Sequence, residues 1–385
     1  MTLRQEAHAG QAESQFALGK YYAELDHAPD KGGDRNQVAL KWFMKAAVQG
    51  HTKAQHQLGL IYAWGAESLR NEEAAELWLR KATKQGHVGA WIDLGWLLCR
   101  RNEDPAAVIR CFEQAIAHGS PAGYYNLGVL YEHALKDKRD RSKAQEFYRA
   151  AAKLDYAPAH RKLGQILSDI FIGHPPVDLT EAVLCFRRAT ELGDADGQYE
   201  LGKLYEHGRG VPKDVVHAVD FYRLAAVQGH VMAQNVLGRL CREGRGVPQD
   251  FAGALQWFRK AATRDPQLNE TEVTEALNAI GEMYLQGQGV VQDIPTAIKL
   301  FKKAASGNPA AYVNLGILYF EGKLVPCNYI GAKECFSEAA RSGNIEAKGW
   351  LVRMKTIRLC TARPPLAATN KTDNSDQDQL KLGLL

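Results

Sequence analysis

The stretch from Gly197 to Gly229 reads GQYELGKLYEHGRGVPKDVVHAVDFYRLAAVQG and contains a complete helix-turn-helix pattern. Gly197, Leu201 and Tyr205 are four residues apart, a spacing that places all three on one face of a first helix. A glycine-rich turn follows, and the second half of the stretch ends with two aromatic residues, two alanines and a glycine. Glycine at that position is typical of a helix C-terminus. The stretch therefore predicts two short antiparallel helices, named helix A and helix B below.

The same pattern recurs along most of the chain, which has 385 residues. Each copy is marked in helix A by a Leu-Gly step, once Ile-Gly, and successive glycines are 33 to 43 residues apart. The steps are Leu18-Gly19, Leu58-Gly59, Leu94-Gly95, Leu127-Gly128, Leu163-Gly164, Leu201-Gly202, Leu237-Gly238, Ile280-Gly281 and Leu315-Gly316. A helix pair of this length cannot bury its apolar face alone, so the pairs must stack into an α-solenoid.

The repeats predict the domain boundaries. One solenoid is expected over 1–343, with repeats near 14–50, 51–86, 87–119, 120–155, 156–193, 194–229, 230–270, 271–307 and 308–343. Residues 344–360 have apolar side chains at helical spacing and predict a C-terminal capping helix. The segment 361–385 is polar and is expected to be disordered. Its last six residues, 380–385, are apolar and are either a loose end or a short linear motif, such as an export signal.

The turns carry glycines and capping residues. Three A–B turns read Gly-x-Gly-Val and end with an aspartate that is expected to cap helix B, at Asp214, Asp250 and Asp293. No strand precedes these turns, so a phosphate-binding loop is not expected. Helix B is predicted to end at a left-handed glycine at Gly50, Gly86, Gly119, Gly193, Gly229, Gly307 and Gly343. Three of the following turns contain Gln-Gly-His, which predicts capping roles for His51, His87 and His230.

The combined pattern A-x-x-x-L-G-x-x-Y-x-x-G-x-G-V-x-x-D, followed by an aromatic helix B ending A-A-x-x-G, resembles the Sel1-like repeat, a relative of the tetratricopeptide repeat. The similarity is strongest from about residue 195 to 305 and extends in weaker form over 14–350. The third repeat is closer to a tetratricopeptide. The resemblance implies an all-α fold: a right-handed α-solenoid of about nine antiparallel helix pairs, in which helix A lines the concave surface.

Composition excludes several classes of protein. Lys and Arg number 48 against 44 Asp and Glu, a net charge of +4, which is too balanced for a nucleic-acid-binding surface. No run of about 18 apolar residues occurs, so no membrane span is expected. The N-terminal residues lack the apolar core of a secretory signal. A cytoplasmic location is therefore expected.

The sequence contains little that predicts catalysis. Cys111, Cys185 and Cys335 replace aromatic residues of helix B and Cys241 replaces the helix A tyrosine, so buried, inert thiols are expected. No Cys or His cluster has the spacing of a metal site, and no nucleophile or Walker motif occurs, so we expect no metal, no cofactor and no enzyme. The resemblance leaves one alternative, because a weak hydrolase activity has been attributed to some family members.

Offsets from the Leu-Gly step predict which residues of helix A face the concave groove. The positions two and one before the leucine, and two, five and six after it, are expected to do so. In repeats two to four they include His56, Leu60, Trp64, Ile92, Trp96, Tyr125, Val129 and His133. Trp64 and Trp96 occupy no consensus position and are either a binding hot spot or are buried under the neighbouring turns.

Repeats five to seven present charge instead. The basic residues are Arg161, Lys162, Lys203, Arg239 and Arg242, among the acidic residues Asp169, Glu200, Glu206 and Glu243. This is either a solvated mixed-charge face or a site for an acidic peptide segment. Asn126 and Asn314 precede the leucine, where some tetratricopeptide domains place an asparagine that binds a terminal carboxylate. The supporting residues of such a clamp are absent here.

These features predict a non-enzymatic adaptor that holds a peptide segment or partner domain in its concave groove. The partner is expected to be a protein rather than a nucleic acid or a membrane. One alternative is a regulatory subunit or immunity-type inhibitor, which would cap a single partner tightly over a large area. A hydrolase is the other alternative, and a panel of generic substrates would test it.

Overall fold

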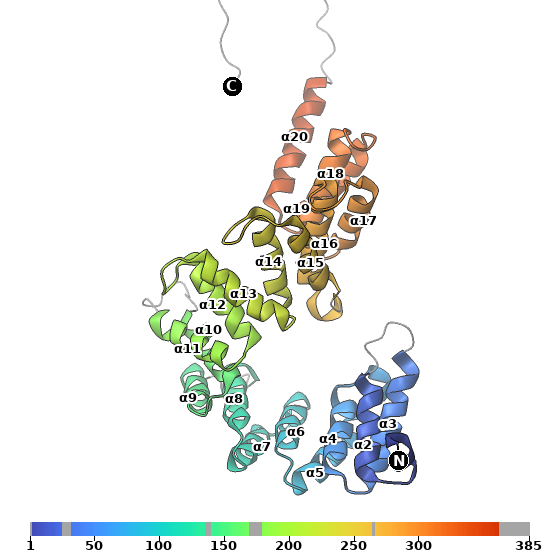
Figure 1. Cartoon of the computed structure of the whole chain (residues 1–385), viewed down its shortest axis with the longest axis vertical. Helices are drawn as coiled ribbons and strands as arrows, with labels where there is room; N and C mark the ends of the chain where they lie inside the picture. The colour runs from blue at the N-terminus through green and yellow to red at the C-terminus, as the bar shows by residue number, and fades with distance from the viewer. Residues whose placement is uncertain (1, 25–31, 135–139, 169–178, 264–265, 362–385) are drawn as a thin grey trace, which may run out of the picture. The chain divides into compact units, whose positions relative to one another are not determined.

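The computed structural model describes residues 2–24, 32–134, 140–168, 179–263 and 266–361. Every regular element in these ranges is helical, and consecutive helices A and B pack against each other as pairs (Figure 1). The predicted all-α fold of helix-pair repeats is therefore confirmed. No helix among the described residues is long and apolar enough to cross a membrane.

The chain forms two compact units. The N-terminal unit comprises Met1–Ala233 and Arg245–Val247 and begins with a short helix, α1 (Leu3–His8). Its helices A are α2 (Ala12–Glu24), α4 (Thr52–Trp64), α6 (Val88–Arg100), α8 (Pro121–Val129), α10 (Ala157–Ser168) and α12 (Ala195–His207). Its helices B are α3 (Gly32–Val48), α5 (Glu72–Lys84), α7 (Pro105–Ala117), α9 (Arg141–Ala152), α11 (Leu179–Glu191) and α13 (Val215–Val227). Two short elements, η2 (Glu67–Leu69) and the π-helical turn η3 (Leu130–Ala134), follow α4 and α8.

The C-terminal unit comprises Gln234–Gly244 and Pro248–Leu385. Helix α14 (Val231–Glu243) begins just before this unit and has most of its residues within it. The further helices are α15 (Phe251–Ala262), α16 (Pro266–Gln286), α17 (Ile294–Ala304), α18 (Pro309–Glu321), α19 (Tyr329–Arg341) and α20 (Ile345–Thr361). Helix α20 lies where the capping helix is expected, and it buries Ala347 and Met354. The expected disordered tail lies outside the described residues, apart from Thr361.

The glycine of each Leu-Gly step lets helices A and B of one repeat approach closely. A Cβ atom on any of these nine glycines would lie 2.5 to 2.8 Å from a side-chain atom of helix B. That side chain is aromatic in eight repeats and Leu79 in the second. In the sixth repeat the glycine is Gly202 and the ring is that of Tyr222, which is fully buried.

Most of the predicted helix ends are found. Six of the seven glycines have a φ between 78° and 91°, and the prediction is wrong only for Gly307, which does not have a positive φ. At Gly307 glycine serves close packing instead, because a Cβ there would lie 2.8 Å from Thr274 Oγ1. Asp155, with φ 55°, takes the left-handed position after α9.

The capping predictions agree with the hydrogen bonds. Asp214, Asp250 and Asp293 accept a hydrogen bond from the backbone amide three residues later, at 2.9 to 3.1 Å. His51 and His87 do the same through Nδ1, which accepts from the amides of Ala54 and Ala90 at 3.1 and 3.2 Å. His230 Nδ1 likewise accepts from Ala233, at 3.1 Å. Each of these imidazoles must be unprotonated at Nδ1 to act as a cap.

The variant His87→Asn is expected to lose less thermal stability than wild type when the pH is lowered. Burial lowers the pKa of His87 below 6.5, and His56 and Lys53 lower it further, while Asp93 opposes them. The folded state therefore binds this proton less readily than the unfolded chain. The stabilisation is fully present above the unfolded pKa of 6.5 and is lost as the pH falls from there through the folded pKa. Thermal unfolding midpoints measured between about pH 7.5 and pH 5 give the dependence of stability on pH, which is compared between variant and wild type.

Asparagine is the suitable replacement because this chain already uses it as a helix cap. Asn71 Oδ1 accepts from the amide of Ala74 at 2.9 Å, and an amide side chain does not titrate. The variant should keep the cap and flatten part of the pH dependence, since the pKa of His160 is also lowered, mainly by burial. An identical slope in variant and wild type would contradict the assigned role of His87.

The cysteines predicted to be core residues are buried or half-buried. Burial raises the pKa of the Cys111 and Cys185 thiols to about 11, and it also raises that of Cys335. Cys241 is half-buried. A thiol with a raised pKa is a poor nucleophile at neutral pH, in agreement with a packing role. No group of three or more potential metal ligands occurs among the described residues.

Candidate functional site

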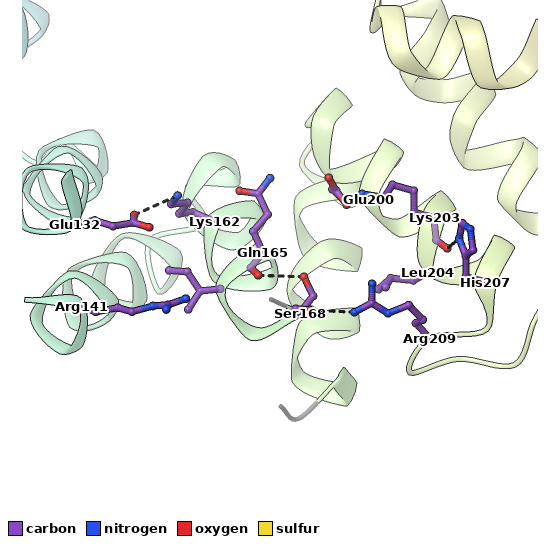
Figure 2. Close-up of a pocket in the computed structure, with 11 residues that line it drawn as sticks. Glu132, Arg141, Lys162, Gln165, Ser168, Glu200, Lys203, Leu204, His207 and Arg209 are labelled. Atoms are coloured by element: carbon purple, nitrogen blue, oxygen red, sulfur yellow. Dashed lines mark hydrogen bonds and ion pairs between the residues drawn. The ribbon is translucent and has the colours of Figure 1, made fainter. Parts of the chain in front are cut away.

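A pocket of about 560 Å³ opens in the N-terminal unit between residues of three successive repeats (Figure 2). Its walls come from η3, the start of α9, α10, α12 and the turn after α12. The lining residues are Glu132, Arg141, Lys162, Gln165, Ile166, Ser168, Glu200, Lys203, Leu204, His207 and Arg209. Four of them are Lys or Arg and two are Glu, so the lining is polar and carries an excess of positive charge.

The repeat explains why these side chains meet. Residues at equal offsets from the Leu-Gly step lie above one another in stacked helices A. Seven lining residues hold the offsets expected to face the groove, namely Glu132, Lys162, Gln165, Ser168, Glu200, Lys203 and His207. In Figure 2, Lys162 and Gln165 project from α10 across from Glu200 and Lys203 on α12.

One wall of the pocket contains an ion pair whose glutamate is also held by a buried tyrosine. Lys162 Nζ lies 3.2 Å from Glu132 Oε2, and these side chains are 20% and 15% exposed. Tyr148 Oη donates to the same oxygen at 2.6 Å. Tyr148 is fully buried, and burial and the nearby carboxylate of Glu132 raise the pKa of its hydroxyl, so it stays a donor. Glu132 is therefore held in place by a hydrogen bond that does not depend on Lys162.

The opposite wall holds a looser ion pair. Lys203 Nζ lies 2.8 Å from Glu200 Oε2 within α12, and these side chains are 41% and 23% exposed. His207 Nδ1 donates to the carbonyl oxygen of Lys203 at 2.9 Å. At the rim, Arg209 Nη2 donates to the carbonyl oxygen of Ser168 at 3.0 Å. The pocket thus combines ammonium, guanidinium, amide and hydroxyl donors.

The predicted aromatic residues of repeats two to four do not line this pocket. Trp64 is 43% exposed and stacks under the Arg100 guanidinium, 4.4 Å from the ring centre. Trp96 is half-buried: its Nε1 donates to Asn126 Oδ1 at 2.7 Å, and its ring centroid lies 5.4 Å from that of Phe112 in the core. Trp96 therefore contributes to packing as well as to the surface.

Two other candidates of these repeats, His56 and Tyr125, are also in contact with neighbouring side chains. His56 Nε2 lies 2.6 Å from Asp93 Oδ2, and its ring is 4.2 Å from that of His87. Tyr125 packs between the rings of Tyr148 and Tyr156, at 5.6 and 5.5 Å. Three further candidates, Leu60, Ile92 and Val129, are half-buried, whereas His133 is exposed.

The charged candidates are mostly paired with carboxylates. Arg161 Nε lies 3.3 Å from Asp194 and 3.4 Å from Asp196, outside the pocket lining. In the C-terminal unit, Arg242 Nη1 lies 2.7 Å from Glu282 Oε2, and Asn314 Nδ2 donates to Asn278 Oδ1 at 3.0 Å. Arg239 is exposed in the same unit. Burial raises the pKa of Glu275 above its ordinary value, and Arg239 opposes this shift.

Two expectations about acidic residues change. Glu206 is expected among the surface carboxylates but is only 5% exposed; Tyr222 Oη donates to it at 2.8 Å and Arg245 lies 3.4 Å away. Asp169 lies outside the described residues. Sequence reasoning missed Glu132, Gln165, Ser168 and His207, which the groove offsets mark, and Arg141 and Arg209, which no offset marks.

Comparison with known proteins supports the repeat. The Sel1 repeat family profile matches residues 12–51, 52–87, 121–156, 157–194, 195–230, 231–266, 274–308 and 309–344. A Sel1 repeat protein from Oxalobacter formigenes, of known crystal structure, is 29% identical with a TM-score of 0.54. That alignment covers 82% of this chain and 90% of that chain.

Two curated relatives match in part. An uncharacterized protein of Neisseria meningitidis is 26% identical over 210 residues, which cover 54% of this chain and 41% of the relative. The ERAD-associated E3 ubiquitin-protein ligase component HRD3B of Arabidopsis thaliana is 30% identical over 133 residues, 34% of this chain and 20% of the relative. The chain thus spans less than half the length of these relatives. Because the family profile matches eight segments that together cover most of the sequence, the chain belongs to the Sel1 repeat family.

Proposed function

We propose that this chain is a non-enzymatic scaffold that holds a segment of a partner protein in the pocket of repeats four to six. Sel1 repeats generally mediate protein–protein interaction, and scaffolds of this family and of its tetratricopeptide-like relatives are generally non-catalytic. The observation that supports this site most directly is that one pocket is lined by residues of three successive repeats, with two helices A, α10 and α12, in its walls.

The character of the lining favours a peptide segment over an apolar small molecule. Pockets for small molecules are mostly lined by apolar and aromatic side chains. This pocket instead presents Lys162, Gln165, Lys203 and Arg209, with Ile166 and Leu204 as apolar contacts. Such donors suit the carbonyl groups and charged side chains of an extended chain. Its length along three repeats suits a segment rather than a single side chain.

The name of one relative supports a scaffold role. HRD3B is by its name a component of an E3 ubiquitin-protein ligase. A partner that caps the chain over a large area, as an inhibited enzyme would, remains the competing arrangement, and the experiment below separates the two.

The double variant Lys162→Glu/Lys203→Glu is expected to lose its protein partners. Reversing both charges places four carboxylates in the lining where there are two, and like charges brought together at an interface cost several kcal/mol. In affinity purification from a lysate of the source organism, quantified by mass spectrometry, recovery of the partner should fall at least about tenfold. Circular dichroism of the double variant, compared with wild type, shows whether the helical fold is retained.

The matched control is Arg110→Glu/Arg223→Glu, which makes the same change in net charge on helices B. Both arginines are exposed, on α7 and α13, and neither lines the pocket. The control should recover the partner as well as wild type does. Equal recovery by the pocket variant would place the interface elsewhere and would favour the capping arrangement.

A further inference from the structure

We infer that the segment bound in this pocket is acidic and that Glu200 competes with it for Lys203. The inference rests on the proposed function and adds to it the chemistry of the ligand. In the free protein, Glu200 takes the position that a ligand carboxylate would occupy, and the ligand displaces it on binding.

The Lys203–Glu200 pair has the properties of an exchangeable contact. The two residues are three apart on α12, and the Lys203 side chain is 41% exposed. Ion pairs of this kind contribute little to stability, since water and salt compete for both partners. A ligand carboxylate that replaced Glu200 would therefore gain a hydrogen-bonded cation while disrupting little of the fold.

The Lys162–Glu132 pair differs because Glu132 has a second partner. Tyr148 Oη holds Glu132 Oε2 at 2.6 Å, and both side chains of the ion pair are mostly buried. Glu132 thus stays in place when a ligand binds. Lys162 can contact the ligand only while it also remains paired with Glu132. Of the two lysines in the lining, Lys203 can therefore be released by its carboxylate and Lys162 is fixed.

Charge complementarity selects a protein segment over a nucleic acid. A nucleic acid carries a negative charge on the phosphate of every nucleotide, and these phosphates would be repelled by the fixed carboxylate of Glu132 inside the pocket. A peptide with carboxylates on some side chains can place one at Lys203 and another at Arg209 while its uncharged parts lie against Glu132. The net charge of the chain, +4, gives no dense basic surface for a longer polyanion.

The test measures binding of fluorescein-labelled hexaglutamate by anisotropy, with hexaglutamine as the uncharged probe. The full chain should bind hexaglutamate and not hexaglutamine. Glu200→Gln should tighten binding about threefold, because the competing carboxylate is removed. The control Asp220→Asn removes the same charge from an exposed pair on α13, where Asp220 lies 3.4 Å from Arg223, and should leave the affinity unchanged.

The effect of Glu200→Gln must also act through Lys203. In a Lys203→Gln background, Glu200→Gln should have no effect. The inference would be overturned if Glu200→Gln and Asp220→Asn raised the affinity for hexaglutamate equally, or if Glu200→Gln raised it in the absence of Lys203. It would also be overturned if oligothymidine displaced the labelled probe at a lower concentration than unlabelled hexaglutamate does. If hexaglutamate fails to bind while Lys162→Glu/Lys203→Glu still loses the cellular partner, the inference fails and the proposed function stands. If that double variant keeps its partner, the proposed function fails.

Discussion

The substitution Gly202→Ala is expected to lower the free energy of unfolding of the N-terminal unit by about 1–3 kcal/mol, the usual cost of overfilling a packed core. The added Cβ would lie 2.8 Å from Cδ1 and Cε1 of the Tyr222 ring. The ring cannot move aside easily, because it is fully buried and its hydroxyl is bonded to Glu206. The higher helix propensity of alanine offsets about 1 kcal/mol of the clash.

Thermal unfolding followed by circular dichroism measures this effect, which corresponds to a midpoint lower by roughly 2–8 °C. The matched control is Gly349→Ala, since Gly349 is also inside a helix but its Cβ would meet nothing within 4 Å. That variant should be unchanged or stabilised by up to about 1 kcal/mol. If both variants shift the unfolding midpoint in the same direction, the close packing of helices A and B does not restrict this position of the Leu-Gly step to glycine.

The helix pairs and their ends could be predicted because their causes are local. A Leu-Gly step, an aromatic residue of helix B and a polar cap each depend on neighbours within one repeat. Gly307 shows the limit: its sequence context matches that of Gly343, but the backbone there is not left-handed. The close approach of Thr274, from the preceding helix A, explains its glycine and could not be derived from the local pattern.

The residues of the candidate site could be predicted only in part, because the pocket depends on contacts between repeats. Lys162 and Lys203 were named from their offsets, and both line the pocket. Glu132 and Glu206 hold the same offset, and each accepts a hydrogen bond from a helix B tyrosine. Glu132 nevertheless lines the pocket, whereas Glu206 is buried with Arg245 of the next turn beside it. No single-repeat pattern distinguishes these two carboxylates.

The buried carboxylate of Glu206 leads to the second large effect, which is expected for Tyr222→Phe. Tyr222 Oη donates to Glu206 Oε2 at 2.8 Å, and Glu206 is 5% exposed. A hydrogen bond to a charged group contributes about 1.5–3 kcal/mol, and losing it here leaves a buried carboxylate with fewer donors. Tyr148→Phe should cost less, since Glu132 is more exposed and keeps Lys162 at 3.2 Å.

The control is Tyr205→Phe in the same repeat. Arg187 donates to Tyr205 Oη at 2.7 Å in an exposed contact, so removing this hydroxyl should change stability by less than about 0.5 kcal/mol. Urea unfolding of the three variants gives the comparison directly. A cost for Tyr222→Phe no larger than that for Tyr205→Phe would mean that Arg245 and its surroundings satisfy Glu206 without the tyrosine. In that case the shared tyrosine–glutamate contact of repeats four and six would be a consequence of packing rather than a source of stability.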